Sequence, residues 1–119
     1  MLRISIATEY QPEHSEPAQG QYVFHYQIEI HNDFDQPVTL QRRYWLITDG
    51  NGKQTEVDGV GVVGQTPTIA ANDSFSYRSA VVLETPIGLM QGHYQLTGAN
   101  GAFNSPIAPF QLCQPGALH

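Results

Sequence analysis

Apolar and polar side chains alternate along much of this chain with a period of two residues, which is the signature of a β-strand with one buried face. The alternation is strictest over residues 22–31. The apolar positions there are Tyr22, Phe24, Tyr26, Ile28 and Ile30. The same alternation of apolar and polar side chains occurs over residues 2–10. Both segments are therefore predicted to be strands that pack against a core.

The rest of the chain also divides into short extended segments separated by turn residues. Further strands are predicted at 38–48, 54–57, 68–71, 74–83, 92–97 and 102–112. Residues rich in Gly, Pro, Asn and Asp predict turns or tight connections at 32–37, 49–52, 59–64, 72–73, 85–88 and 100–101. A sustained apolar period of 3.6 residues, which would indicate a helix, is absent from the sequence.

About seven or eight short strands with regular turns predict one all-β domain over residues 1–119, an antiparallel sandwich of the immunoglobulin or fibronectin-III type. Trp45 lies on the third strand, where such sandwiches often place a core tryptophan. Tyr94 is expected near the start of a late strand, as in a tyrosine corner. Pro106 and Pro109 predict that the last strand lies at a sheet edge or contains a bulge.

Composition narrows the classes of function. The formal net charge of -6 makes nucleic acid an unfavourable partner, because phosphates repel an acidic surface. The chain lacks an apolar run of the ~20 residues that a membrane helix needs, so we expect no direct membrane insertion. It has a single cysteine, Cys113, and no recognisable signal peptide, so we expect a reducing, cytoplasmic environment.

A distinctive string of residues resembles a known family. It comprises residues 43–48, 50–52, 56–57, 59–64, 75–79, 84–86, 88 and 90–94. In this order and spacing the string resembles the bacterial ApaG family over residues 22 to about 110. The resemblance implies a fibronectin-III-like sandwich in the bacterial cytoplasm, associated with cobalt resistance and with magnesium or cobalt efflux as an accessory to a transporter. Related domains in eukaryotic F-box and polymerase-interacting proteins look like protein-binding modules.

Gly59, Gly61 and Gly64 match the G-x-G-x-x-G fingerprint of dinucleotide-binding proteins. That fingerprint requires a following helix, and the sequence after residue 64 shows no helical pattern. We therefore expect a bulged strand or tight connection in which glycine relieves crowding. A weaker alternative is an anion-binding nest of backbone N–H groups, assisted by Arg42 and Arg43.

The sequence contains little evidence for a metal site or a catalytic site. His25, Glu29 and His31 share one strand face, but alternate residues lie about 6.8 Å apart, too far for His25 and His31 to chelate one ion. Glu29 and His31 could bind one ion only with help from a neighbouring strand, so we expect a solvated sheet face with no metal or other cofactor, and direct cobalt or magnesium binding is a third alternative. Neither His93 nor Cys113 lies in a recognised catalytic motif, so we expect no enzymatic activity.

Tyr44 and Trp45 are neighbours on a strand and must point to opposite faces. We expect Trp45 in the core, and Tyr44 either paired across strands or exposed beside an arginine, as in protein-binding hot spots. Tyr44, Pro106 and Pro109 are the candidate interaction surface. The leading hypothesis is a non-enzymatic module that binds an unidentified protein and supports divalent cation homeostasis, with a homodimer left open. The alternative is a protein that binds a phosphate-bearing or nucleotide metabolite at residues 59–64.

Overall fold

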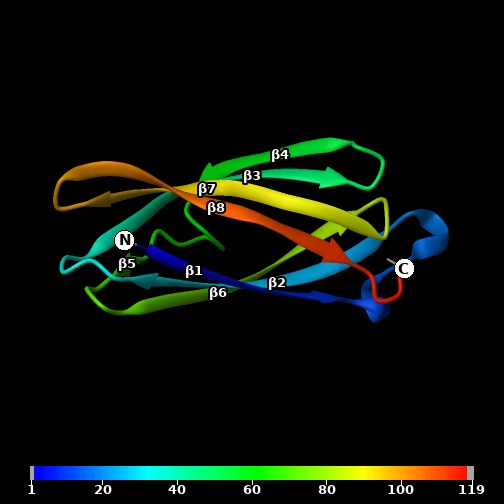
Figure 1. Ribbon diagram of the computed structural model, residues 1–119, viewed down its shortest axis with the longest axis horizontal. Coiled ribbons are helices and arrows are strands. Elements are labelled where there is room, and N and C mark those ends of the chain that lie inside the picture. The colour runs from blue at the N-terminus through cyan, green and yellow to red at the C-terminus, as the bar shows by residue number, and fades with distance from the viewer. Residues whose placement is uncertain (1, 118–119) are drawn as a thin grey trace.

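The computed structural model describes residues 2–117, and almost all of that range is built from β-strands (Figure 1). The strands are β1 (Leu2–Tyr10), β2 (Tyr22–Asn32), β3 (Val38–Asp49), β4 (Gln54–Val60), β5 (Thr68–Ile69), β6 (Ser74–Leu83), β7 (Ile87–Gly98) and β8 (Gly101–Cys113). Two single-turn 3-10 helices, Pro12–His14 and Pro17–Gln19, lie between β1 and β2. The described range contains no α-helix.

The strands form two antiparallel sheets that stack as two layers of a sandwich, 49 Å long and 26 by 22 Å across (Figure 1). One sheet has three strands in the order β1-β2-β6. The other has five strands, with β4-β3-β7-β8 in order and β5 paired to β3. The all-β sandwich predicted from the sequence is therefore confirmed.

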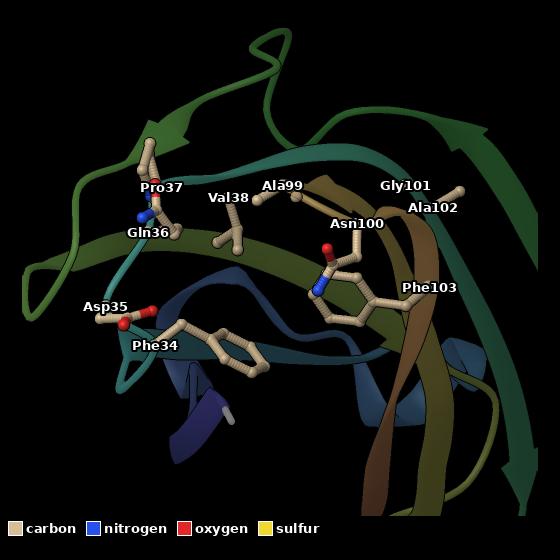
Figure 2. Close-up of a pocket in the computed structure, with 11 residues that line it drawn as sticks. Phe34, Asp35, Gln36, Pro37, Val38, Ala99, Asn100, Gly101, Ala102 and Phe103 are labelled. Atoms are coloured by element: carbon tan, nitrogen blue, oxygen red, sulfur yellow. The ribbon is translucent and has the colours of Figure 1, made fainter.

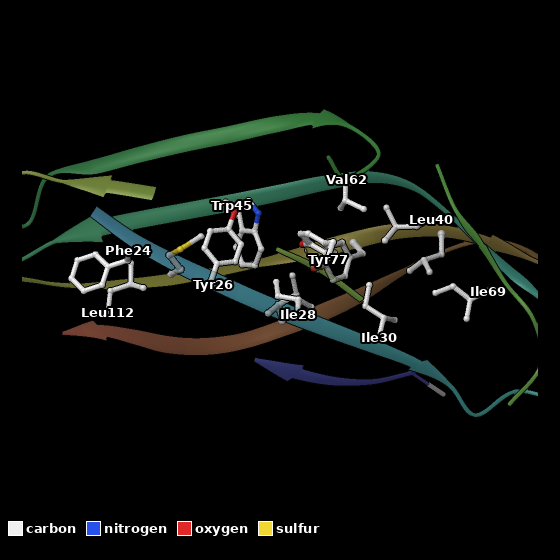
Figure 3. Packing of buried hydrophobic residues seen from close by; sticks show 14 of the residues in the cluster. Phe24, Tyr26, Ile28, Ile30, Leu40, Trp45, Val62, Ile69, Tyr77 and Leu112 are labelled. Atoms are coloured by element: carbon white, nitrogen blue, oxygen red, sulfur yellow. Dashed lines mark hydrogen bonds between the residues drawn. The ribbon is translucent and has the colours of Figure 1, made fainter. Parts of the chain in front are cut away.

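The core lies between the layers and is supplied by the alternating apolar positions of both sheets (Figure 3). On β2 the buried apolar residues are Phe24, Tyr26, Ile28 and Ile30, as the period of two predicts. The five-stranded sheet contributes the following side chains: Val38, Leu40, Trp45, Met90, Tyr94, Leu96, Ile107 and Leu112. Burial of these side chains is the main favourable term in folding.

Trp45 is the largest of these core side chains and is only 2% exposed. Its ring meets Tyr26 of the opposite sheet and Phe110 of β8 edge-on, with centroids 5.8 and 5.7 Å away. Such tilted aromatic pairs add to the stabilisation that buried area provides. The prediction that Trp45 lies in the core is confirmed.

The last strand, β8, lies at the edge of the five-stranded sheet and contains a bulge. Ile107 pairs with Gly92 and Phe110 with Met90, so two residues of β8 oppose the single Gln91 of β7. Both parts of the prediction made from the two prolines are confirmed, since the strand is an edge strand and its ladder is interrupted beside them.

Two strands begin or end differently from the prediction. Strand β4 continues to Val60, because Gly59 pairs with Arg43 instead of starting a loop. Strand β7 begins at Ile87 rather than at residue 92, so Tyr94 lies in mid-strand. The Tyr94 hydroxyl forms a 2.5 Å hydrogen bond with the hydroxyl of Tyr77 in the other sheet, so the tyrosine-corner prediction is wrong.

Candidate functional site

The outer surface of the five-stranded sheet carries an aromatic and charged patch that crosses three strands. Tyr44 of β3 pairs with His93 of β7, which pairs with Pro106 of β8. Residues directly opposite each other in a sheet point to the same face, so these three side chains form one row. On the other side of Tyr44 the register continues to Asp58 of β4. We call Arg42, Tyr44, Asp58, His93 and Pro106 the Tyr44 face.

Tyr44 and His93 form the centre of this face. Their rings are stacked, with centroids 5.2 Å apart and planes inclined by 23°. Partial desolvation of the phenol, followed by the nearby carboxylate of Glu56, raises the pKa of Tyr44 above its usual value. The hydroxyl of Tyr44 therefore stays protonated at neutral pH and remains able to donate a hydrogen bond.

Charges and a shallow hollow border the ring stack. Arg42 forms an exposed ion pair with Asp58, at 3.3 Å between Nη2 and Oδ1. The hollow has a volume of about 180 Å³ and is lined by Arg42, Arg43, Tyr44, Asp58, His93 and Gln95. The face thus combines a stacked aromatic pair with positively and negatively charged groups that can form hydrogen bonds. This composition is typical of protein-binding hot spots.

The structure brings together only part of the predicted interaction surface. Tyr44 and Pro106 lie in the same row, and Pro106 is exposed. Pro109 is also exposed, but it lies in the bulge of β8, beyond Pro106. Sequence reasoning missed His93, the residue that joins Tyr44 to Pro106, because the β3–β7 register is not visible in a single sequence.

The glycines of the G-x-G-x-x-G match have structural roles at two of three positions. Gly59 leaves room for the Arg43 side chain, since a Cβ at residue 59 would lie 2.9 Å from Arg43 Nη1. Gly61 has a φ of +66°, and its Cβ would lie 2.1 Å from the carbonyl oxygen of Gln65. After Gly61 the chain reverses in a tight turn, in which Gln65 N–H donates to Val62 O.

The two arginines proposed for an anion site do not converge on this loop. Arg43 Nη1 donates to the carbonyl oxygen of Gly61 at 2.9 Å, whereas Arg42 pairs with Asp58 on the outer surface. The N–H groups of Gly61 and Val62 are already bonded to the carbonyls of Gln41 and Gln65. The loop therefore offers carbonyls to a cationic side chain, and the chain continues from it into β5 rather than into a helix.

The histidines of the three-stranded sheet are held by surface contacts. His31 Nδ1 lies 2.7 Å from Ser74 Oγ, and His31 Nε2 lies 3.2 Å from Asp33 Oδ1. His25 stacks against His14 with ring centroids 6.3 Å apart. Across residues 2–117, no group of three or more His, Cys, Asp or Glu side chains is arranged to hold a metal ion.

A second hollow lies at one end of the sandwich, between the β2–β3 loop and the β7–β8 turn (Figure 2). Its volume is about 190 Å³, and Phe34 and Phe103 meet edge-on beside it with centroids 5.8 Å apart. Phe34 is 37% exposed. One signal that could have located this hollow is the aromatic residue Phe34 within an otherwise polar turn at 32–37.

None of the helices in the described part of the chain has the length and apolar character needed to cross a membrane.

Comparison with known proteins identifies relatives over nearly the whole length. A family model for the ApaG domain matches residues 12–98. The chain is 50% identical to the protein ApaG of Shewanella halifaxensis over 119 residues, covering 99% of this chain and 94% of the relative. The protein ApaG of Shewanella piezotolerans is likewise 50% identical with the same coverage.

A solved structure agrees with these sequence matches. The crystal structure of a Bordetella pertussis protein assigned as ApaA is 45% identical and superposes with a TM-score of 0.93, covering 98% of this chain and 95% of that one.

Proposed function

This chain belongs to the ApaG domain family, and we propose that it works as a non-enzymatic module that binds another protein through the Tyr44 face. The observation that carries the proposal is the row formed by Tyr44, His93 and Pro106 on the outer surface of the five-stranded sheet. Tyrosine and arginine are enriched among the residues that dominate binding energy, and Arg42 lies beside Tyr44 on this face.

The rigidity of the face supports binding. Strands β3 and β7 pair along almost their full length, so the stacked rings of Tyr44 and His93 are already in place before a partner arrives. A partner that contacts them does not have to order a loop, which lowers the entropic cost of association. The exposed ion pair of Arg42 and Asp58 provides polar contacts at the rim.

We further propose that this binding supports divalent cation homeostasis, through cobalt or magnesium efflux, in a bacterial cytoplasm. The resemblance to the ApaG family is what motivates this role. We propose an indirect role, in which the chain acts on another protein, because residues 2–117 contain no group of three or more His, Cys, Asp or Glu side chains arranged to hold a metal ion.

The test compares the wild type with Tyr44→Ala as baits in affinity capture from the bacterium's own cytoplasm, with and without cobalt. Gln54→Ala is the matched control, because residue 54 is exposed at the far end of the β3–β4 pair. Binding of the captured protein is then measured with purified components. Loss of a hot-spot side chain should weaken binding about 30-fold or more, while Gln54→Ala should leave it unchanged.

Two outcomes would contradict the proposal. Equal affinity of the captured protein for the wild type and for Tyr44→Ala would show that the Tyr44 face is not the binding surface. Chemical conversion of a metabolite by the purified chain would contradict the proposal that the chain is not an enzyme. For the cation role, a strain lacking the protein should regain cobalt tolerance with the wild-type chain and with Gln54→Ala, but not with Tyr44→Ala.

A further inference from the structure

Apart from the two-residue β5, the two sheets have four edge strands, and they differ in how well they are protected against pairing with another chain. Strand β8 carries Pro106, Pro109 and a bulge. Strand β4 is short, places Glu56 and Asp58 on its exposed side, and ends close to a tight turn. Strand β1 has β8 of the other sheet packed alongside it.

The remaining edge, β6, has none of these protections. It runs for ten residues, contains no proline or glycine, and pairs with β2 alone in a register without interruption. Its outer side chains are exposed and carry one charge: Ser74, Ser76, Arg78, Ala80 and Val82. A long, regular and weakly charged edge of this kind is the preferred template for strand addition.

The hydrogen-bond pattern shows which backbone groups of β6 are available. Asn32 N–H donates to the carbonyl of Asp73, and Gln11 N–H donates to the carbonyl of Val23. In an antiparallel ladder the bonded residues alternate, so even-numbered residues of β2 bond to β6 and odd-numbered ones to β1. Residues 74, 76, 78, 80 and 82 therefore direct their backbone groups away from β2, toward the open edge, where the N–H of Ser74 already donates to Asp73 Oδ1.

The charged side chains on and beside β6 restrict which segments can pair with this edge. Within residues 2–117, Arg78 makes no ion pair or side-chain hydrogen bond, whereas the other four cationic side chains each have a partner. Asp73 precedes β6, and Glu84, which follows it, is already paired with Lys53, so Arg78 is the one unpaired charge along the described strand. A second copy that used all five open residues would set its own Arg78 opposite Arg78, and like charges directly opposite each other destabilise a sheet.

We propose that β6 accepts an extended segment of a different protein, which adds as a fourth strand to the three-stranded sheet and carries a carboxylate opposite Arg78. Apolar residues at alternate positions would cover the half-buried side chains of Phe75 and Val81. This surface lies on the other sheet from the Tyr44 face, and the inference goes beyond the proposed function.

The probe is a synthetic peptide long enough to span β6, in which valine alternates with threonine, with glutamate at the centre and lysine at both ends. A second peptide has lysine at the centre and glutamate at the ends. Binding is measured by fluorescence anisotropy. The glutamate-centred peptide should bind the wild-type chain at least tenfold more tightly, and Arg78→Glu should reverse that preference.

A proline substitution tests whether backbone pairing is involved. Ala80→Pro removes an N–H that faces the open edge and leaves the β2–β6 ladder intact, so it should weaken peptide binding at least tenfold. Gln111→Pro makes the same change at the open side of β8 and should leave binding unchanged. Circular dichroism and thermal melting confirm that each variant folds. Tyr44→Ala should bind the peptide normally, which separates this test from that of the proposed function.

Amide hydrogen exchange in the wild-type chain supplies an independent readout. Added peptide should slow exchange at residues 76, 78, 80 and 82 and leave residues 75, 77, 79 and 81 as they were. Three results would overturn the proposal: no saturable binding of the peptide, equal binding by Ala80→Pro, or protection of these amides that rises with protein concentration without peptide. The last result would assign the edge to a second copy.

Discussion

Alanine substitution at the three glycines of residues 59–64 should produce a graded loss of stability, because the three backbones differ. At Gly61 a Cβ would lie 2.1 Å from the Gln65 carbonyl oxygen, and φ is +66°. At Gly64 φ is +79°, but nothing lies within 4 Å of the added carbon. At Gly59 φ does not lie in the left-handed region, and only the flexible end of Arg43 is close, at 2.9 Å.

The three substitutions should therefore lower the free energy of unfolding by different amounts. Placing an alanine in the left-handed region costs about 1 kcal/mol, which is the whole effect expected for Gly64→Ala. Gly61→Ala adds a clash with backbone that must shift, so its total should be about 3 kcal/mol. Gly59→Ala loses about 1 kcal/mol from the Arg43 hydrogen bond to Gly61 O and regains a similar amount from reduced entropy of the unfolded chain. Its net effect should be near zero.

Urea unfolding followed by tryptophan fluorescence measures the free energy of unfolding for each variant. The expected order of destabilisation is Gly61→Ala, then Gly64→Ala, then Gly59→Ala. A Gly61→Ala variant as stable as the wild type, or an equal loss of stability in all three variants, would contradict this expectation. A parallel titration with pyrophosphate and ATP, followed by amide chemical shifts, should give no saturable change in the wild-type loop.

Three further predictions concern single side chains. Val63 is a β-branched residue at a φ of +43° before Gly64, so Val63→Asn should raise the free energy of unfolding by about 1 kcal/mol in urea titrations. Asn32→Asp should reduce the free energy of unfolding by about 3 kcal/mol, because the buried Asn32 amide donates to carbonyls of the β2–β3 loop and β5. Thermal melting should show this loss as a strongly lowered melting temperature. Burial raises the pKa of both Tyr77 and Tyr94 above the usual value of 10, so folding favours the neutral phenols. The contribution of these neutral phenols to folding stability is complete below about pH 10 and is lost as the pH rises above it. Phenolate absorbance should therefore increase together with the loss of the folded circular dichroism signal.

The layers of the fold could be predicted from the sequence because the alternation of side chains is local. Residues 22–31 and 74–83 read as half-buried strands, and the structure has strands there. The start of β7 could not be predicted in this way, because Pro86, Ile87 and Gly88 look like a turn. Gly88 instead lies within the strand, where a Cβ would lie 2.5 Å from Leu83 Cδ1 and 3.0 Å from the carbonyl oxygen of Thr48.

The candidate site was less predictable because it depends on register between distant segments. Tyr44 was expected either to pair across strands or to be exposed beside an arginine, and its stacking partner His93, supplied by another strand, could not be identified from the sequence. Arg42 and Arg43 looked equivalent as neighbours in sequence. They point to opposite faces, as strand geometry requires, so only Arg42 belongs to the Tyr44 face.

The claim that this sandwich recognises a protein with the Tyr44 face is tested most directly by mapping amide chemical shifts of the full labelled chain during titration with the captured partner. The account predicts saturable shifts clustered at residues 42–46 and 91–95, which Tyr44→Ala abolishes. Saturable shifts confined to residues 59–64, with none on β3 or β7, would contradict it.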